Sequence, residues 1–352
     1  MPDPPGAGVI VQSSMQTANN RVAEGEEMIV IDGLVKRFGP FTAVDGISFS
    51  VSRGEVLGFL GPNGAGKSTT MKMVTGFLAP SEGAVSICGH DIATEQLAAQ
   101  RMIGYLPEGA PAYGDMTPRG FLKFIARIRA LSGAAADRAI AEAVEATELQ
   151  GVLDQPIDTL SKGFRRRVGL AQAILHNPPV LIMDEPTDGL DPNQKHEVRK
   201  LIARMAAEKA IIISTHILEE VDAICTRALI IDRGRIVADG TPAELISRSR
   251  YHNAVSLTVG GQMTAAAAET LKALPGIESI EIHPRGSETT FTLFPLREAS
   301  AAGVKLIDAV AALAHEMNWP VRTLYGEPGR LDEVFRKLTR SDTADNQEKN
   351  AA

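Results

Sequence analysis

One stretch limits the possible folds of this chain more than any other. Residues 61–68 read Gly-Pro-Asn-Gly-Ala-Gly-Lys-Ser, which is the pattern G-x-x-x-x-G-K-S. The apolar run before it, residues 56–60, has the length of a strand, and residues 69–74 place apolar side chains at helical spacing. Strand, glycine loop and helix in this order indicate a phosphate site rather than a chance glycine turn.

The chemistry of such a loop is local. Glycines let backbone N–H groups converge on phosphate oxygens because no Cβ stands in the way, and the helix start adds unpaired N–H groups. Lys67 can reach the β- and γ-phosphates, and the Ser68 hydroxyl can ligate Mg²⁺. We therefore expect a nucleoside triphosphate to bind along the loop, through Gly61, Pro62, Asn63, Gly64, Ala65, Gly66, Lys67, Ser68 and Thr69.

Composition narrows the class of protein. The 352 residues are enough for two domains, and 36 basic against 43 acidic side chains give a net charge of −7. This charge provides no general attraction to nucleic acid or anionic lipid, so no nucleic-acid partner is expected. The two cysteines exclude a disulfide framework and fit a reducing cytoplasm. No apolar run approaches the ~18 residues that a membrane helix needs.

The pattern along the chain predicts an α/β protein with a helical insertion and a second, smaller domain. We expect a disordered leader over residues 1–27, the main domain over 28–248 with its helical part at about 109–160, an accessory domain over 249–340, and a flexible tail over 341–352. Strands are predicted at 28–31, 47–51, 83–87, 103–106, 180–184 and 210–214. Beyond residue 248 the order β-α-β-β-α-β predicts a ferredoxin-like fold, on which a last helix at 331–338 is expected to pack.

Two predicted strands end in polar side chains. The apolar run 180–184 has the character of a buried parallel strand, and it ends with Asp184 and Glu185. Beside a phosphate loop these carboxylates favour a Mg²⁺ and water site over a helix cap. His216 follows the strand 210–215, at the same sheet edge, where a γ-phosphate contact is favoured over a purely structural role.

Further candidates flank these strands. Ser161 is a plausible N-cap, which makes the helix at 166–175 a second place for an anion. Arg165, Arg166 and Arg167 oppose its dipole, and a solvated or acid-paired face is favoured for them. Phe38 either stacks on an adenine ring or fills the core under the first hairpin, and the sequence leaves both open.

Taken together, residues 28 to about 244 resemble the ATP-binding subunits of ABC transporters. The glycine loop is similar to the Walker A motif, residues 160–164 to the signature loop, and residues 180–184 to the Walker B strand. The resemblance implies that Glu185 and His216 are catalytic, that Asp184, Ser68 and Glu108 are metal ligands, and that Ser161, Gly163 and Asp191 join the nucleotide contacts of Phe38, Glu108 and the loop. Residues 105–108, 160–164 and 189–194 are most similar to the gliding-motility and multidrug exporter branch.

The chain departs from the family pattern at two places. Lys162 and Phe164 replace a Gly and a Gln of the usual signature L-S-G-G-Q, although Ser161 and Gly163 remain. Glu108 stands where the family has a Gln that couples nucleotide to permease. These changes concern the rate and the coupling more than the fold.

The resemblance implies ATP and Mg²⁺ as cofactors and a head-to-tail dimer, either of this chain or with a homologous ATPase. It also implies a separate integral membrane permease, so that the ATPase lies peripherally on the cytoplasmic face of the membrane. The alternatives are a non-transport ATPase of the same superfamily, acting on nucleic acid or the ribosome, and a nucleotide sensor without turnover, against which Glu185 argues. The accessory domain is either a regulatory or dimer-stabilising module or a passive lid.

Overall fold

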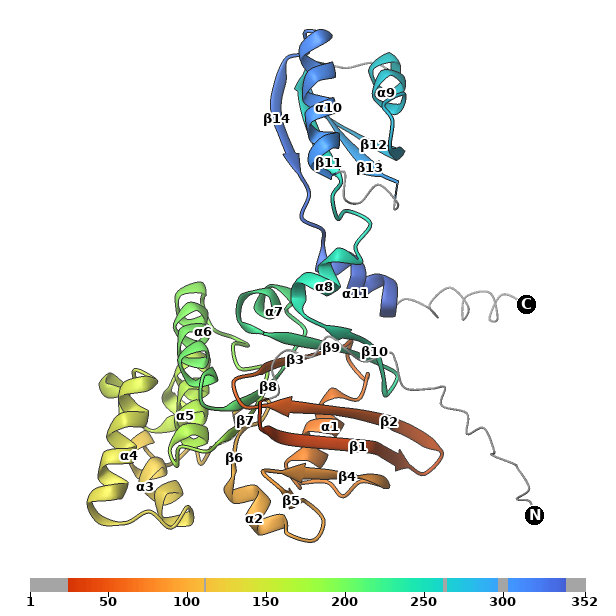
Figure 1. Cartoon of the computed structure of the whole chain (residues 1–352). Helices are drawn as coiled ribbons and strands as arrows, with labels where there is room; N and C mark the ends of the chain where they lie inside the picture. Colours follow the sequence, from red (N-terminus) through yellow and green to blue (C-terminus); the bar gives the residue numbers. More distant parts are fainter. Residues whose placement is uncertain (1–24, 111, 262–264, 297–302, 340–352) are drawn as a thin grey trace, which may run out of the picture.

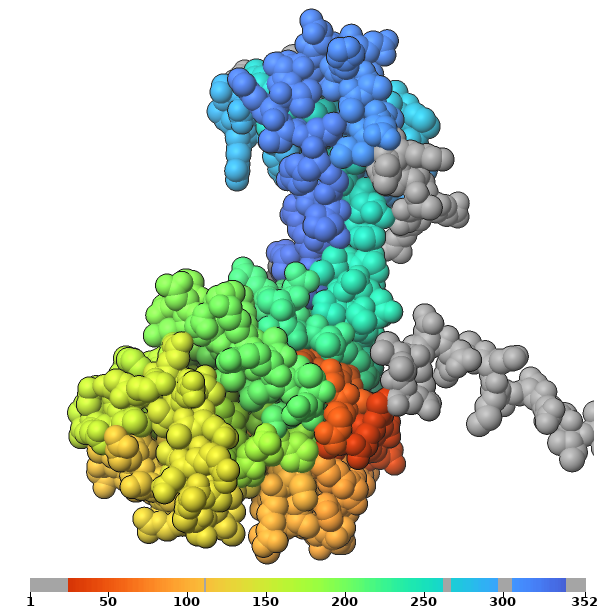
Figure 2. Space-filling view, turned by 60° about the vertical axis from the view of Figure 1, so that its left-hand side comes forward, coloured from red at the N-terminus to blue at the C-terminus, as the bar shows by residue number. Residues whose placement is uncertain are grey.

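The computed structural model describes residues 25–110, 112–261, 265–296 and 303–339. Most of the expected leader and the expected tail therefore lie outside the described residues. Within these ranges the chain forms two lobes, and the smaller one stands away from the larger one on a narrow neck (Figure 1; Figure 2). None of the helices in these ranges is long and apolar enough to cross a membrane.

A six-stranded sheet forms the centre of the larger lobe, in the order β10-β9-β3-β8-β7-β6. Its strands are β3 (Val56–Leu60), β6 (Ile103–Leu106), β7 (Val180–Asp184), β8 (Ala210–Thr215), β9 (Arg227–Asp232) and β10 (Arg235–Gly240). Neighbours pair in parallel except in the β9–β10 hairpin. Every residue of β3, β7 and β8 is buried, as expected of parallel strands covered on both faces.

A second, antiparallel sheet has the order β2-β1-β4-β5. Its strands are β1 (Glu27–Phe38), β2 (Phe41–Ser52), β4 (Glu82–Ile87) and β5 (His90–Asp91). The predicted strands at 28–31 and 47–51 are parts of one longer hairpin, whose pairing continues to Phe38 and Phe41. Register shifts along this hairpin break the apolar alternation, so the pattern indicated only its regular end.

Helix α1 (Lys67–Val74) lies between the two sheets. Its Met71 and Met73 belong to one core cluster with Val44 of β2 and Ile182 of β7. A short helix, α2 (Gln96–Arg101), precedes β6. Helices α6 (Pro192–Ala206), α7 (Leu218–Ile224) and α8 (Pro242–Ser247) pack against the opposite face of the central sheet in a second cluster.

Helices and turns occupy the stretch at about 109–160 where a helical insertion was predicted. They are α3 (Pro118–Ile128), α4 (Gly133–Ala146) and two short 3-10 turns, Gln150–Val152 and Ile157–Thr159, and α5 (Lys162–Ile174) follows them before β7. These elements bury a cluster of their own around Phe121 and Leu122. The start of α5 was placed too late by the sequence pattern, because Ser161 caps the helix and the helical backbone begins directly after it.

The smaller lobe has the predicted β-α-β-β-α-β order. Its elements are β11 (Val255–Gly260), α9 (Ala265–Lys272), β12 (Ile277–Arg285), β13 (Glu288–Pro295), α10 (Gly303–Glu316) and β14 (Val321–Gly326). The sheet order is β12-β13-β11-β14, and each pair is antiparallel. This is the split β-α-β arrangement, with its own core between the helices and one sheet face.

The last helix, α11 (Leu331–Thr339), does not pack where the sequence predicted. It crosses back over the neck and lies against α8 and β9 of the larger lobe (Figure 1). Leu331 belongs to the same core cluster as Leu245 of α8, and Phe335 and Leu338 pack against that cluster. The sequence showed the apolar stripe of α11 but not the surface that it covers. The spacing of apolar residues in a helix indicates that one face is buried, and it does not indicate which element packs against that face.

Candidate functional site

The glycine loop joins β3 to α1, and its first and last glycines leave no room for a side chain. A Cβ on Gly61 would collide with the carbonyl oxygen of Ile231, and one on Gly66 would lie 2.6 Å from that of Ala43. Gly66, with φ 108°, is the N-cap of α1 and gives it no side-chain cap. The first N–H groups of α1 are therefore left for an anion, which is the property predicted for this loop.

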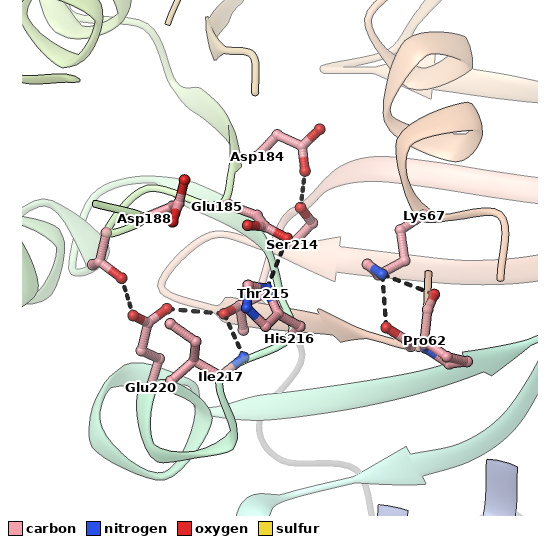
Figure 3. Close-up of polar contacts among 12 residues, drawn as sticks. Pro62, Lys67, Asp184, Glu185, Asp188, Ser214, Thr215, His216, Ile217 and Glu220 are labelled. Carbon is pink, nitrogen blue, oxygen red and sulfur yellow. Dashed lines mark hydrogen bonds and ion pairs between the residues drawn. The ribbon is translucent and has the colours of Figure 1, made fainter. Parts of the chain in front are cut away.

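Lys67 lies across its own loop. Its side chain is 7% exposed, and Nζ donates hydrogen bonds to the carbonyl oxygens of Gly61 at 2.6 Å and Pro62 at 3.1 Å (Figure 3). Burial lowers the pKa of Lys67, while the charges of Glu185, Asp184 and Glu108 act in the opposite direction. The phosphate loop and the predicted carboxylates therefore share one electrostatic environment.

The carboxylates meet His216 at the ends of two paired strands. Asp184 of β7 lies opposite Ser214 of β8, whose hydroxyl donates a hydrogen bond to the Asp184 carboxylate. Glu185 follows Asp184, and its Oε1 lies 2.9 Å from Nδ1 of His216 (Figure 3). The His216 side chain is 54% exposed and that of Glu185 only 19%. The predicted meeting of these residues at one sheet edge is observed.

Arg166 is a site residue that the sequence prediction missed. It is 5% exposed, and its guanidinium donates to the carbonyl oxygens of Asp184, Glu185 and Pro186, and to that of Pro107. The solvated or acid-paired reading is wrong for Arg166, although Arg167 does pair with Glu148 at 2.5 Å. Helical spacing was the available signal, because Arg166 shares a buried helix face with Gly163 and Leu170.

A second loop with anion-binding character begins α5. The Ser161 hydroxyl accepts a hydrogen bond from the amide of Phe164 at 3.3 Å. A Cβ on Gly163 would lie 2.6 Å from Oε1 of Gln194, so the side chain of Gln194 would have to shift to make room for a larger residue there. Lys162 forms an ion pair with Asp188 at 2.7 Å, and this hydrogen bond is the main reason that the pKa of Asp188 is lowered.

The amino-acid sequence was also compared with known proteins. A family model described as ABC transporter matches residues 44–188. The chain is 34% identical over 316 residues to a Nod factor export ATP-binding protein I of Paraburkholderia xenovorans. The aligned residues cover 89% of this chain and 97% of the relative. The chain belongs to the ATP-binding proteins of ABC transporters.

Two further similarities support this membership. A linearmycin resistance ATP-binding protein of Bacillus subtilis is 34% identical over 315 residues, which cover 89% of this chain and 98% of the relative. A solved structure of an ATP-binding subunit of an ABC transporter is 32% identical to this chain, with a TM-score of 0.59. The matched part is 62% of this chain and 91% of the chain in that structure. Since the two relatives match more than 300 residues, their similarity extends beyond the larger lobe into the smaller one.

As a member of this family, the chain binds ATP and is an ATPase of the transport class. The comparisons favour this reading over an ATPase that acts on nucleic acid or the ribosome. The family motifs expected from the sequence occupy the loops described above.

The remaining predicted contacts are placed as follows. Phe38 is 49% exposed at the end of β1, which excludes the core-filling alternative, and the Lys36 ammonium lies 5.2 Å from its ring centre. Glu108 is exposed after β6, and its charge acts on Lys67 and Tyr105. Asp191 caps α6, accepting a hydrogen bond from the amide of Gln194 at 2.9 Å. For Asp191 the structure adds a structural role to the predicted nucleotide contact.

Proposed function

We propose that this chain is the ATP-hydrolysing subunit of an ABC exporter and works as a dimer attached to a separate membrane permease on the cytoplasmic face. A solved bacterial ABC transporter cassette with 22% identity to this chain is described as dimeric. The two relatives above are described as serving Nod factor export and linearmycin resistance. The observation that carries the catalytic part is the Glu185–His216 pair, at 2.9 Å, on the sheet edge that faces Lys67.

The head-to-tail arrangement follows from where one chain places its two anion-binding loops. Helix α1 packs in the cluster between the sheets, whereas α5 packs in the clusters of the helical insertion and the opposite sheet face. One chain thus holds two separate half-sites. A second copy, or a homologous ATPase, rotated so that its Ser161 faces the first chain's glycine loop, would enclose the γ-phosphate from both sides.

Within the composite site each residue has a distinct proposed role. Glu185 accepts a hydrogen bond from the attacking water and orients it toward the γ-phosphate. Lys67 turns from its own loop carbonyls to the phosphate oxygens, which offer its buried ammonium a stronger partner. His216, exposed at the same edge, contacts the γ-phosphate and is held by Glu185. Phe38 stacks on the adenine ring.

The residues present fit a magnesium ion. In the described part of the chain no three His, Cys, Asp or Glu side chains gather as a ready-made metal site. Mg²⁺ prefers one or two protein ligands together with substrate phosphates and water, so Ser68 and Asp184, with Glu108 as the third candidate, are a suitable set. When bound, the ion would neutralise charge on the β- and γ-phosphates.

We also propose that the two domains of the chain have different functions. Residues 28–248, with the helical part at about 109–160, form the ATPase domain, and residues 249–340 form an accessory domain that regulates the dimer or stabilises it. Its last helix, α11, packs back on the ATPase domain. A similar solved ATP-binding subunit of an ABC transporter covers 62% of this chain, which supports the proposal that the accessory domain is an addition to the catalytic unit.

The test of the function is Glu185→Gln in the full-length protein. Loss of the carboxylate should lower the turnover number by about 10²–10⁴-fold, the usual contribution of a positioned general base, because a neutral amide polarises water poorly. ATP affinity should be retained, since the phosphate loop is untouched. Steady-state hydrolysis is measured together with ATP binding. An unchanged turnover number would contradict the catalytic assignment.

The transport part needs a separate measurement. The purified chain should co-purify with an integral membrane protein from its own cells, and ATP hydrolysis should rise when both are reconstituted in vesicles. Hydrolysis that responds to nucleic acid or ribosomes, and not to the membrane partner, would favour the alternative function.

A further inference from the structure

Glu220 is a buried carboxylate to which the mechanism above gives no role. It lies on α7 and is 0% exposed. Its two oxygens accept hydrogen bonds from two threonine hydroxyls, those of Thr187 and, at 2.9 Å, Thr215 (Figure 3). Burial raises the pKa of Glu220, and the hydrogen bond from Thr215 opposes that rise. A carboxylate is costly to bury, so its retention here calls for an explanation.

The two threonines belong to the two turns that carry the proposed catalytic pair. Thr187 lies two residues after Glu185, in the turn that follows β7. Thr215 directly precedes His216 at the end of β8, and its hydroxyl also accepts a hydrogen bond from the amide of Ile217 at 3.0 Å. Glu220 is therefore the common anchor of both turns, and His216 is held on either side by groups that this anchor fixes.

We propose that Glu220 is a positioning residue for ATP hydrolysis, which holds the turn of Glu185 and the turn of His216 in register with each other. This inference rests on the proposed catalytic roles of Glu185 and His216. His216 is itself exposed, and its one described side-chain partner is Glu185. Without the anchor, the two turns keep the bond between the Glu185 amide and the Ser214 carbonyl oxygen, but the residue next to His216 loses its link through Glu220 to Thr187. A displacement of about 1 Å in such a pair is enough to slow chemistry by roughly 100-fold.

The anchor can be broken without removing the helix that supplies it. Helix α7 is held by the buried side chain of Val221, with Leu218 and Ile224 packed against the same cluster. Glutamine has nearly the shape of glutamate but carries no charge, and one of its two terminal groups is a donor, so one threonine hydroxyl would have to turn from donor to acceptor. Glu220→Gln therefore replaces two charge-assisted hydrogen bonds by weaker neutral ones and leaves the packing in place.

The experiment compares Glu220→Gln with Glu219→Gln, which changes an exposed neighbour on the same helix. In the full-length protein Glu220→Gln should lower kcat by about 10- to 100-fold, while KM and ATP affinity change by less than about twofold. Glu219→Gln should behave as wild type. Thr215→Val should lower kcat by a similar factor. Thr215→Ser, which keeps the hydroxyl, should have the kcat of wild type.

A second readout does not depend on activity. The ring resonances of His216, in protein with labelled histidine, should shift in Glu220→Gln and stay in place in Glu219→Gln. Wild-type kcat in Glu220→Gln, or unshifted His216 resonances there, would overturn the proposal even if Glu185→Gln behaves as expected. If Glu185→Gln hydrolyses ATP as fast as wild type, the proposed function fails and the positioning role fails with it.

Discussion

Glu185 shows how a single residue is prepared by its surroundings. Its backbone has φ 50°, a left-handed conformation that residues other than glycine rarely adopt. The Glu185 amide donates a hydrogen bond to the carbonyl oxygen of Ser214 at 2.9 Å, and the guanidinium of Arg166 donates one to the carbonyl oxygen of Glu185. These bonds compensate the unfavourable backbone, and they turn the side chain toward His216. Backbone conformations of this kind occur at sites where geometry matters more than local stability.

A pH prediction arises at His176. Burial, and next the charge of Arg129, lower its pKa from 6.5 to about 4, and its Nδ1 is buried without a hydrogen-bond partner in the described residues. The unfolded chain therefore binds a proton before the folded chain does, so the stability from the neutral ring is complete above pH 6.5 and is lost as pH falls toward 4.

The free energy of unfolding, measured from pH about 7 down to about 4, should fall less steeply in His176→Gln than in wild type. His196→Gln is the control, because His196 is exposed on α6. Parallel pH curves for wild type and His176→Gln would show that this histidine does not contribute to acid destabilisation.

At the scale of elements, α11 determines how the two lobes are joined. The chain leaves the larger lobe after α8, builds the smaller lobe, and returns so that α11 packs on α8. The first crossing segment is also tied to the smaller sheet, because the guanidinium of Arg250 lies 3.9 Å from the ring centre of Phe294 in β13. The two segments are tied to each other, because the guanidinium of Arg330 lies 3.7 Å from the ring centre of Tyr251. The neck is therefore a packed junction made of two segments.

Leu331→Ala should weaken this junction from the side of the larger lobe. Removing a buried leucine side chain costs about 2–5 kcal/mol, and the amides of α8 and β9 should exchange faster with solvent as a result. Lys337→Ala, on the exposed face of the same helix, should leave exchange unchanged. If exchange became faster only in β11–β14, α11 would stabilise the smaller lobe and not the larger one.

At the scale of the whole molecule, the proposed dimer makes a prediction about mixtures. Lys67→Ala should disable the phosphate loop and Ser161→Ala the opposing loop, so each variant alone should hydrolyse ATP poorly. In a mixed head-to-tail dimer one site receives both changes and the other receives neither. At equal amounts with free exchange, half of the dimers are mixed, and about a quarter of the wild-type rate should return.

The mixture is measured against each variant alone, with exchange followed by differently tagged chains. Recovery marks a composite site made by two chains. Exchange without recovery at any ratio would mean that each chain completes its own site, which would contradict the head-to-tail arrangement.

The sequence by itself determined the elements and most of the site. The motif at residues 61–68, the apolar strand before Asp184 and the β-α-β-β-α-β order are local patterns, and local patterns predict strands, helices and loops with definite ends. The rule that parallel strands end at one edge then predicted that His216 lies at the same sheet edge as Asp184.

Only the tertiary structure decided which groups serve that site from elsewhere in the chain. Arg166, Ser214 and Glu220 act on the carboxylate turn through contacts between residues far apart in sequence, and α11 found its partner across the neck. A buried charge and an apolar stripe both signal that a partner exists. Which partner it is depends on the packing of the whole chain. The residues that bury or hydrogen-bond one another can lie any distance apart in the sequence, so no fixed spacing reveals them.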